Sequence, residues 1–161
     1  MQLTLPARPE NIAIVRHALG AFGEAFAMDS QILSDVRLAV TEACTNVVVH
    51  AYPDGSQGPM EVFANLTDKE LHVIVRDEGK GITPRPDSPG LGLGLPLIAS
   101  LAESVNLGRD EHERTEVQMT FSLSNEHPYD LQAKFGAANG PDQDQLLAED
   151  KPRHSAPSTE P

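Results

Sequence analysis

The most informative stretch of the sequence runs from Thr41 to Tyr52 and reads TEACTNVVVHAY. Its apolar residues continue a helix-spaced series made up of Ile32, Val36, Ala39, Val40, Ala43 and Val47. Glu42, Asn46 and His50 follow at i, i+4 and i+8, so on a regular α-helix they stack along one side, next to the apolar stripe. Such a polar row predicts either the wall of a pocket roofed by a sheet or an ordinary solvated flank.

Working outward, the sequence predicts a cap for this helix at Asp29 or Ser30 and a turn after it at residues 52–55. The other expected elements are a strand at 2–5 stopped by Pro6, a helix over 9–27, strands at 60–66 and 71–75, a helix from 93–96 to about 103, and strands at 104–107 and 115–123. The short polar segment 67–70 predicts an antiparallel hairpin.

A second polar motif, RDEGKG at residues 76–81, directly follows the apolar strand 71–75. Asp77 is therefore expected at a strand end, where its carboxylate can accept a hydrogen bond from an exocyclic amine such as that of adenine. Gly79 and Gly81 allow the backbone to turn sharply and approach a flat base closely. The same residues also suit a plain Asp/Gly turn.

A third motif, GLGLGL at residues 90–95, places Gly90, Gly92 and Gly94 in front of a predicted helix. Alternating glycines expose backbone N–H groups, and the helix N-terminus adds a favourable potential for an anion. A dinucleotide-binding unit would carry this motif after its first strand. Here it follows a loop late in the domain, so it does not fit a dinucleotide-binding unit, and a glycine-rich loop alone is only weak evidence of a site.

The composition of the 161 residues narrows the class of protein. The net charge of −12 argues against nonspecific binding to nucleic acid and against an anionic membrane surface. The single cysteine, Cys44, allows no internal disulfide, and the histidines show no metal-ligand spacing, so no zinc site is expected. No long apolar run or signal-peptide pattern is evident, which favours a cytoplasmic protein.

The sequence changes character after Leu123. The segment 124–161 has five prolines and seven acidic residues against three basic ones, with few apolar anchors. We expect a folded domain over residues 1–123 and an acidic, mostly disordered tail over residues 124–161.

In order, these motifs are a helix with Glu-x-x-x-Asn, a hairpin, Asp-x-Gly-x-Gly, and Gly-x-Gly-x-Gly opening a helix. Together they resemble the GHKL ATPase superfamily, over residues 1–123. Within it, the stretch 41–52 with its His-Ala-Tyr ending resembles the N-box of the anti-sigma-factor serine kinases. The resemblance implies the Bergerat ATP-binding fold, an α/β (α+β) two-layer sandwich whose mixed, mostly antiparallel sheet is covered on one face by about three helices.

The resemblance also implies ATP and Mg²⁺ as ligands. Asn46 would give its amide oxygen to Mg²⁺, and Glu42, one turn earlier, would be the general base. Asp77 would accept the adenine amine, with Gly79 and Gly81 packed near the base.

Three glycines and a threonine complete the implied site. Gly90, Gly92 and Gly94 would form the phosphate-side loop, and Thr115 matches a threonine near the adenine pocket. The chain departs from the family pattern at Arg114, where a glycine usually stands, and in the eight residues between Gly81 and Gly90, where a longer lid is usual.

The first functional hypothesis is a serine/threonine protein kinase that phosphorylates an anti-anti-sigma protein and sequesters a sigma factor. The resemblance suggests a homodimer formed through the N-terminal strand and first helix. The alternative is a nucleotide-binding module with weak or no catalysis, which the short lid and Arg114 favour. A catalytic fragment of a sensor histidine kinase is a third possibility, but no segment for its dimerisation helices and phosphoacceptor is evident.

Overall fold

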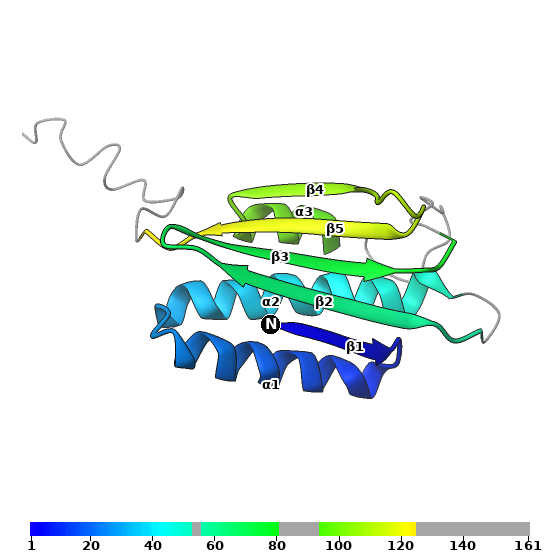
Figure 1. Cartoon of the computed structure of the whole chain (residues 1–161), viewed down its shortest axis with the longest axis horizontal. Helices are drawn as coiled ribbons and strands as arrows, with labels where there is room; N and C mark the ends of the chain where they lie inside the picture. The colour runs from blue at the N-terminus through cyan, green and yellow to red at the C-terminus, as the bar shows by residue number, and fades with distance from the viewer. Residues whose placement is uncertain (53–55, 81–93, 125–161) are drawn as a thin grey trace, which may run out of the picture. The chain divides into compact units, whose positions relative to one another are not determined.

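The sheet of this protein has the strand order β1-β2-β3-β5-β4 in a computed structural model that describes residues 1–52, 56–80 and 94–124 (Figure 1). The strands are β1 (Gln2–Pro6), β2 (Pro59–Leu66), β3 (Glu70–Asp77), β4 (Ser104–Arg109) and β5 (Thr115–Ser122). The helices in these ranges are α1 (Pro9–Ala25), α2 (Ser30–Asn46) and α3 (Gly94–Leu101), and a π-helical turn, η1 (Val47–Ala51), follows α2. The predicted elements are confirmed in type and order, and every described strand pairing is antiparallel.

The ends of α1 and α2 follow from local chemistry. Pro9 occupies the first turn of α1, where its missing N–H costs nothing. Ala27 adopts a left-handed backbone, with φ of 49°, and the Met28 N–H donates to the Gly23 carbonyl at 2.9 Å. This C-cap ends α1 two residues before the predicted limit. The Asp29 carboxylate caps α2 by accepting from the N–H groups of Gln31 and Ile32.

The core lies between one face of the sheet and the three described helices (Figure 1). Exposure alternates along β2 and β3, so every second side chain of each strand is buried. The fully buried residues of this face include Val62, Val73, Val75 and Met119, and those of α2 include Val36, Ala39 and Val40. Burying a side chain of this size contributes about 1.5–3 kcal/mol to stability. Because the helical and strand periodicities decide which side chains can be buried together, they specify the two layers.

Gly23 of α1 allows α2 to pack closely against it, and Gly20 lies beside Arg37 of α2. A Cβ on Gly23 would lie 2.5 Å from Cδ1 of Leu33, and a Cβ on Gly20 would touch the Arg37 guanidinium at 3.9 Å. Leu33 and Arg37 are one turn apart on α2, and Gly20 and Gly23 are nearly one turn apart on α1. The Leu33 side chain therefore packs on bare backbone at Gly23, whereas the space beside Gly20 would accept a methyl group.

In the ranges that the structure describes, no helix is both long and apolar enough to span a bilayer. Except for Ser124, the predicted tail lies outside these ranges, as do Gly81, Gly90, Gly92 and the segment between them.

Candidate functional site

The middle helix changes its winding at Asn46. α2 ends at this residue, and Val47–Ala51 continue as the π-helical turn η1. The predicted stacking assumed 3.6 residues per turn, so it holds from Glu42 to Asn46 but not on to His50. π-turns are rare and often occur at functional sites.

The Glu42 and Asn46 side chains are both half-buried. Neither makes an ion pair or a side-chain hydrogen bond with another residue of the described ranges. A carboxylate and an amide one helical turn apart therefore remain available to a ligand.

The loop after β3 packs on η1. The Lys80 N–H donates to the Ala51 carbonyl at 3.1 Å. A Cβ on Gly79 would lie 2.2 Å from the same carbonyl oxygen, so no larger residue fits there without moving the backbone. The arrowhead of β3 and the end of η1 accordingly lie at the same end of the sheet (Figure 1). This contact brings the Asp77 loop and the Asn46 end of α2 together.

Asp77 is the last residue of β3 and is only 5% exposed. Burial raises the pKa of its carboxyl above the ordinary value, although the Gly79 N–H and the Arg109 guanidinium oppose this shift. Its Oδ1 accepts the Gly79 N–H at 2.8 Å, and no other hydrogen bond reaches the carboxylate from the described residues. The second carboxylate oxygen is thus an unused acceptor in a buried place.

Thr115 pairs directly with Asp77 across β3 and β5, and its side chain is on the same, helix-covered face. Its hydroxyl is buried and has no hydrogen-bond partner among the residues that the structure describes. Buried polar groups nearly always have a partner, so an orphaned hydroxyl indicates a missing ligand or water. Asp77 and Thr115 therefore form a pair of polar groups that a bound molecule can satisfy.

Arg114 lies on the other face of the sheet, because side chains alternate along a strand. Its guanidinium contacts Asp110 at 2.7 Å and Glu61 at 3.5 Å. Both carboxylates also face Arg76. Arg114 is therefore held by these carboxylates on the face of the sheet opposite to Thr115.

Gly94 begins α3 directly beside Asn46. A Cβ on Gly94 would lie 3.3 Å from both Nδ2 and Oδ1 of Asn46, closer than a side chain normally packs. The third glycine of the predicted phosphate loop thus allows the helix N-terminus to approach the amide. Gly81, Gly90 and Gly92 lie outside the described residues, so their predicted positions stay predictions.

Two contacts at this end of the sheet were not predicted from the sequence. The Tyr52 hydroxyl bonds to the Glu78 N–H, and an Arg109 nitrogen lies 3.5 Å from the Lys80 carbonyl. Tyr52 ends the N-box stretch, which was the only signal in the sequence that pointed to it. Nothing in the local pattern around Arg109 distinguishes it from a solvated strand residue.

Gly79→Ala should lower the free energy of unfolding by about 1–3 kcal/mol, since the new methyl group would overlap the Ala51 carbonyl. Urea denaturation monitored by circular dichroism measures this loss. Gly108→Ala is the matched control, because a Cβ on Gly108 meets no atom within 4 Å. That variant should unfold within about 0.5 kcal/mol of the wild type. Equal stability of both variants would contradict the packing of the Gly79 loop on η1.

Known proteins are similar to this chain in sequence. The family model for the histidine kinase-like ATPase domain matches residues 5–121. The serine-protein kinase RsbW of Bacillus subtilis (strain 168) is 30% identical over 141 residues, which cover 78% of this chain and 87% of that protein. RsbW of Halalkalibacterium halodurans is 31% identical, over 68% of this chain and 76% of its own length.

An anti-sigma F factor and a solved structure extend the comparison. The anti-sigma F factor of Clostridium acetobutylicum is 28% identical, over 74% of this chain and 90% of its own length. A crystal structure of the RsbU and RsbW domains of a Mycobacterium tuberculosis protein superposes with a TM-score of 0.60 at 24% identity, over 75% of this chain and 31% of that one, which shows the fold alone. On the family match and the identity to RsbW, the chain belongs to the histidine kinase-like ATPase domain family.

Proposed function

We propose that this chain is an ATP-dependent serine/threonine protein kinase of the anti-sigma class. It transfers the γ-phosphate of ATP to a serine of an anti-anti-sigma protein, and it also sequesters a sigma factor. The relatives named serine-protein kinase and anti-sigma F factor support this function over a binding module without catalysis. The observation that carries the proposal is the buried pair of Asp77 and Thr115, at the same end of the sheet as Asn46 and Gly94. The Thr115 hydroxyl has no hydrogen-bond partner among the described residues.

In this proposal the adenine base contacts the Asp77 and Thr115 pair. One oxygen of the Asp77 carboxylate bonds to no described residue and accepts the exocyclic amine. The Thr115 hydroxyl gains the partner that it lacks among the described residues. Gly79 and Gly81 pack near the base. Gly90, Gly92 and Gly94 contribute to the phosphate-side loop, where exposed N–H groups and the N-terminus of α3 favour an anion.

The Asn46 amide fits a Mg²⁺ site. Its side chain lies against Gly94 and has no hydrogen bond within the described residues, so Oδ1 is available to a hard cation. A single protein oxygen suits Mg²⁺, which keeps waters and substrate phosphates as most of its ligands. When bound, the ion would supply positive charge that neutralises the phosphate oxygens.

Glu42 supplies the base for the transfer. Its carboxylate takes the proton from the substrate serine as the serine oxygen forms a bond to the γ-phosphorus. The bond between that phosphorus and the bridging oxygen of the β-phosphate breaks, and ADP leaves with the electron pair. Glu42 is suited to this role because its carboxylate is half-buried and makes no ion pair with any described residue.

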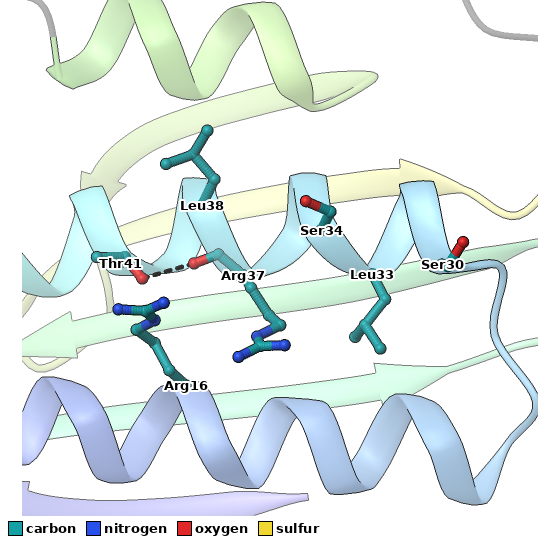
Figure 2. Close-up of a pocket in the computed structure, with 7 residues that line it drawn as sticks. All are labelled: Arg16, Ser30, Leu33, Ser34, Arg37, Leu38 and Thr41. Carbon is teal, nitrogen blue, oxygen red and sulfur yellow. Dashed lines mark hydrogen bonds between the residues drawn. The ribbon is translucent and has the colours of Figure 1, made fainter.

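The protein substrate docks, in this proposal, along a groove between α1 and α2 (Figure 2). The groove has a volume of about 540 Å³ and is lined by Arg16, Ser30, Leu33, Ser34, Arg37, Leu38 and Thr41. Figure 2 shows Arg16 and Arg37 extending from different helices into the same space. Thr41, at one end of the groove, immediately precedes Glu42 in α2.

The charges of the groove indicate an acidic partner. The guanidinium groups of Arg16 and Arg37 make no ion pair or hydrogen bond within the described ranges, although the protein carries 24 acidic residues against 12 basic ones. Leu38 adds an apolar contact, since its side chain is 43% exposed. Two guanidinium groups that pair with no described residue, beside an exposed leucine, suit a segment with carboxylates and an apolar anchor.

Charge reversal tests this docking. Arg16→Glu and Arg37→Glu should each weaken binding of the anti-anti-sigma protein by at least about tenfold at low salt, without changing ATP affinity. Arg8→Glu is the control, because Arg8 is exposed outside the groove and bonds to Gln57. Unchanged partner affinity in both groove variants would assign docking to another surface.

The activity itself is tested with radiolabelled ATP and the cognate anti-anti-sigma protein. Label should move to a serine of that protein and require both Mg²⁺ and the folded kinase domain, residues 1–123. ATP binding without transfer to any natural partner would instead establish the nucleotide-binding module. We also expect the chain to act in the cytoplasm as a homodimer formed through β1 and α1. Light scattering of the purified chain gives its mass in solution and so tests for the dimer.

The raised pKa of Asp77 predicts a pH dependence of ATP binding. The ionised carboxylate accepts the adenine amine, so affinity should fall as the pH drops through the raised pKa of this group. The stability of the ligand-free fold should change in the opposite direction. The Asp77 carboxyl holds its proton more tightly in the folded state than in the unfolded state, so the free energy of unfolding should rise as the pH falls through the same window. Calorimetric titrations at several pH values measure the first effect, and Asp77→Asn should remove it.

A further inference from the structure

The loop that carries the adenine-binding carboxylate is held at three consecutive N–H groups. The Glu78 N–H donates to the Tyr52 hydroxyl at 2.9 Å, the Gly79 N–H to Oδ1 of Asp77 at 2.8 Å, and the Lys80 N–H to the Ala51 carbonyl at 3.1 Å. Two of these three acceptors belong to the end of the N-box stretch. The position of Asp77 is therefore set by residues far from it in the sequence.

Tyr52 makes a second hydrogen bond through the same hydroxyl. It donates to the Pro59 carbonyl at 2.6 Å while it accepts from Glu78. Pro59 begins β2, and the next residue, Met60, pairs with Asp77 across β2 and β3. The Tyr52 hydroxyl thus connects β2, which pairs with Asp77, to the loop that follows Asp77.

The ring of Tyr52 packs directly on Gly58. A Cβ on Gly58 would be 2.1 Å from Cε1 of the ring, so the ring rests on bare backbone just before β2. The hydroxyl is consequently positioned by packing and not only by its own hydrogen bonds. A rigid anchor of this kind can hold a neighbouring carboxylate within a narrow range of positions.

We propose that Tyr52 is a positioning residue for base selection, which fixes the Asp77 carboxylate so that adenine is accepted and guanine is rejected. The inference rests on the proposed nucleotide function. Adenine presents an amine donor where guanine presents a carbonyl oxygen, so a fixed carboxylate gains a hydrogen bond from one base and meets a second acceptor on the other. A site built to bond one polar group rejects an analogue that lacks it, provided that the site cannot relax.

Tyr52→Phe tests the proposal, since it keeps the ring over Gly58 and removes only the hydroxyl. Isothermal titration with Mg-ATP and Mg-GTP gives the ratio of the two dissociation constants. We expect ATP affinity to fall by about three- to tenfold and GTP affinity to stay the same or rise, so that selectivity declines by at least the same factor. If the role of Tyr52 were purely structural, the variant would bind both nucleotides more weakly by the same factor. An unchanged ratio of dissociation constants would therefore overturn the proposal.

Thr67→Ala is the matched control. The Thr67 hydroxyl also joins backbone groups of the β2–β3 hairpin, donating to the Glu70 carbonyl and accepting the Glu70 N–H, but at the far end from Asp77. This variant should lose stability without any change in the ATP to GTP ratio. A ratio that fell as far as in Tyr52→Phe would contradict a local role for Tyr52.

A second variant covers the case in which Tyr52→Phe does not fold. Gly58→Ala keeps the hydroxyl but pushes the ring out of its place, so selectivity should again decline. A wild-type chain that binds neither nucleotide would refute the proposed function itself. A wild type that prefers ATP while Tyr52→Phe and Gly58→Ala keep the full preference would refute only the role of Tyr52.

Discussion

Glu42→Gln should lower the rate of phosphoryl transfer by ~10²–10⁴-fold while ATP affinity stays unchanged, because the variant removes a general base and no nucleotide contact. Glutamine keeps the length and most of the volume of the side chain but cannot accept the serine proton. Single-turnover transfer from radiolabelled ATP to the anti-anti-sigma protein measures the rate, and calorimetry measures the affinity.

The expected loss is specific to this carboxylate. Glu24→Gln provides the control, since Glu24 is an exposed residue near the end of α1 whose side chain makes no hydrogen bond or ion pair within the described ranges. That variant should transfer phosphate at the wild-type rate. If Glu42→Gln transferred equally fast, the base would have to be another group, and the half-buried position of Glu42 would be only structural.

Asp77→Asn should raise the dissociation constant for ATP by roughly 5- to 150-fold, corresponding to about 1–3 kcal/mol. The Oδ1 of an asparagine can still accept the Gly79 N–H, so the loop keeps its turn. The other oxygen becomes an amide NH₂, which meets the adenine amine as donor against donor. Calorimetric titration with Mg-ATP measures the change.

The same substitution should leave the ligand-free fold as stable as the wild type or slightly more so. Burial raises the pKa of Asp77, which means that folding disfavours its charged form at neutral pH. Asparagine carries no charge and removes that cost. Urea denaturation without nucleotide tests whether the stability of Asp77→Asn is unchanged or raised while its ATP affinity falls. A loss of stability in this variant would show that the carboxylate stabilises the fold.

Glu116→Gln serves as the matched control for Asp77→Asn. Glu116 is also a buried carboxylate at this end of the sheet, but it contacts Arg76 at 2.8 Å on the face away from the helices. Its loss should reduce stability and leave ATP affinity unchanged. If ATP binding weakened as much in this variant, a general loosening of the sheet would explain both results.

The type and order of the elements could be read from the sequence, because they depend on neighbours within a few residues. Helical spacing from Ile32 to Val47 predicts α2, and the polar segment 67–70 predicts the hairpin of β2 and β3. The same local patterns also predicted which motifs lie at the ends of helices and strands. Asp77 ends a strand and Gly94 begins a helix, as the sequence predicts.

Local rules did not predict the winding of the last turn of the N-box helix. The regular spacing of Glu42, Asn46 and His50 predicts one continuous helix side, whereas η1 changes the turn after Asn46. The π-turn ends where the Ala51 carbonyl meets Lys80, a residue from beyond the hairpin. A contact between such distant residues depends on how the strands pair and pack, and a single helix pattern does not contain that information.

Only the tertiary structure decided which polar side chains share the candidate site. Strand register placed Thr115 opposite Asp77 and sent Arg114 to the other face, where a shift of one residue would have exchanged them. Packing of α3 on α2 brought Gly94 to Asn46. The sequence by itself determined which chemical groups stand at the ends of the elements, because backbone periodicity is local; packing and register between distant segments determined which of those groups meet.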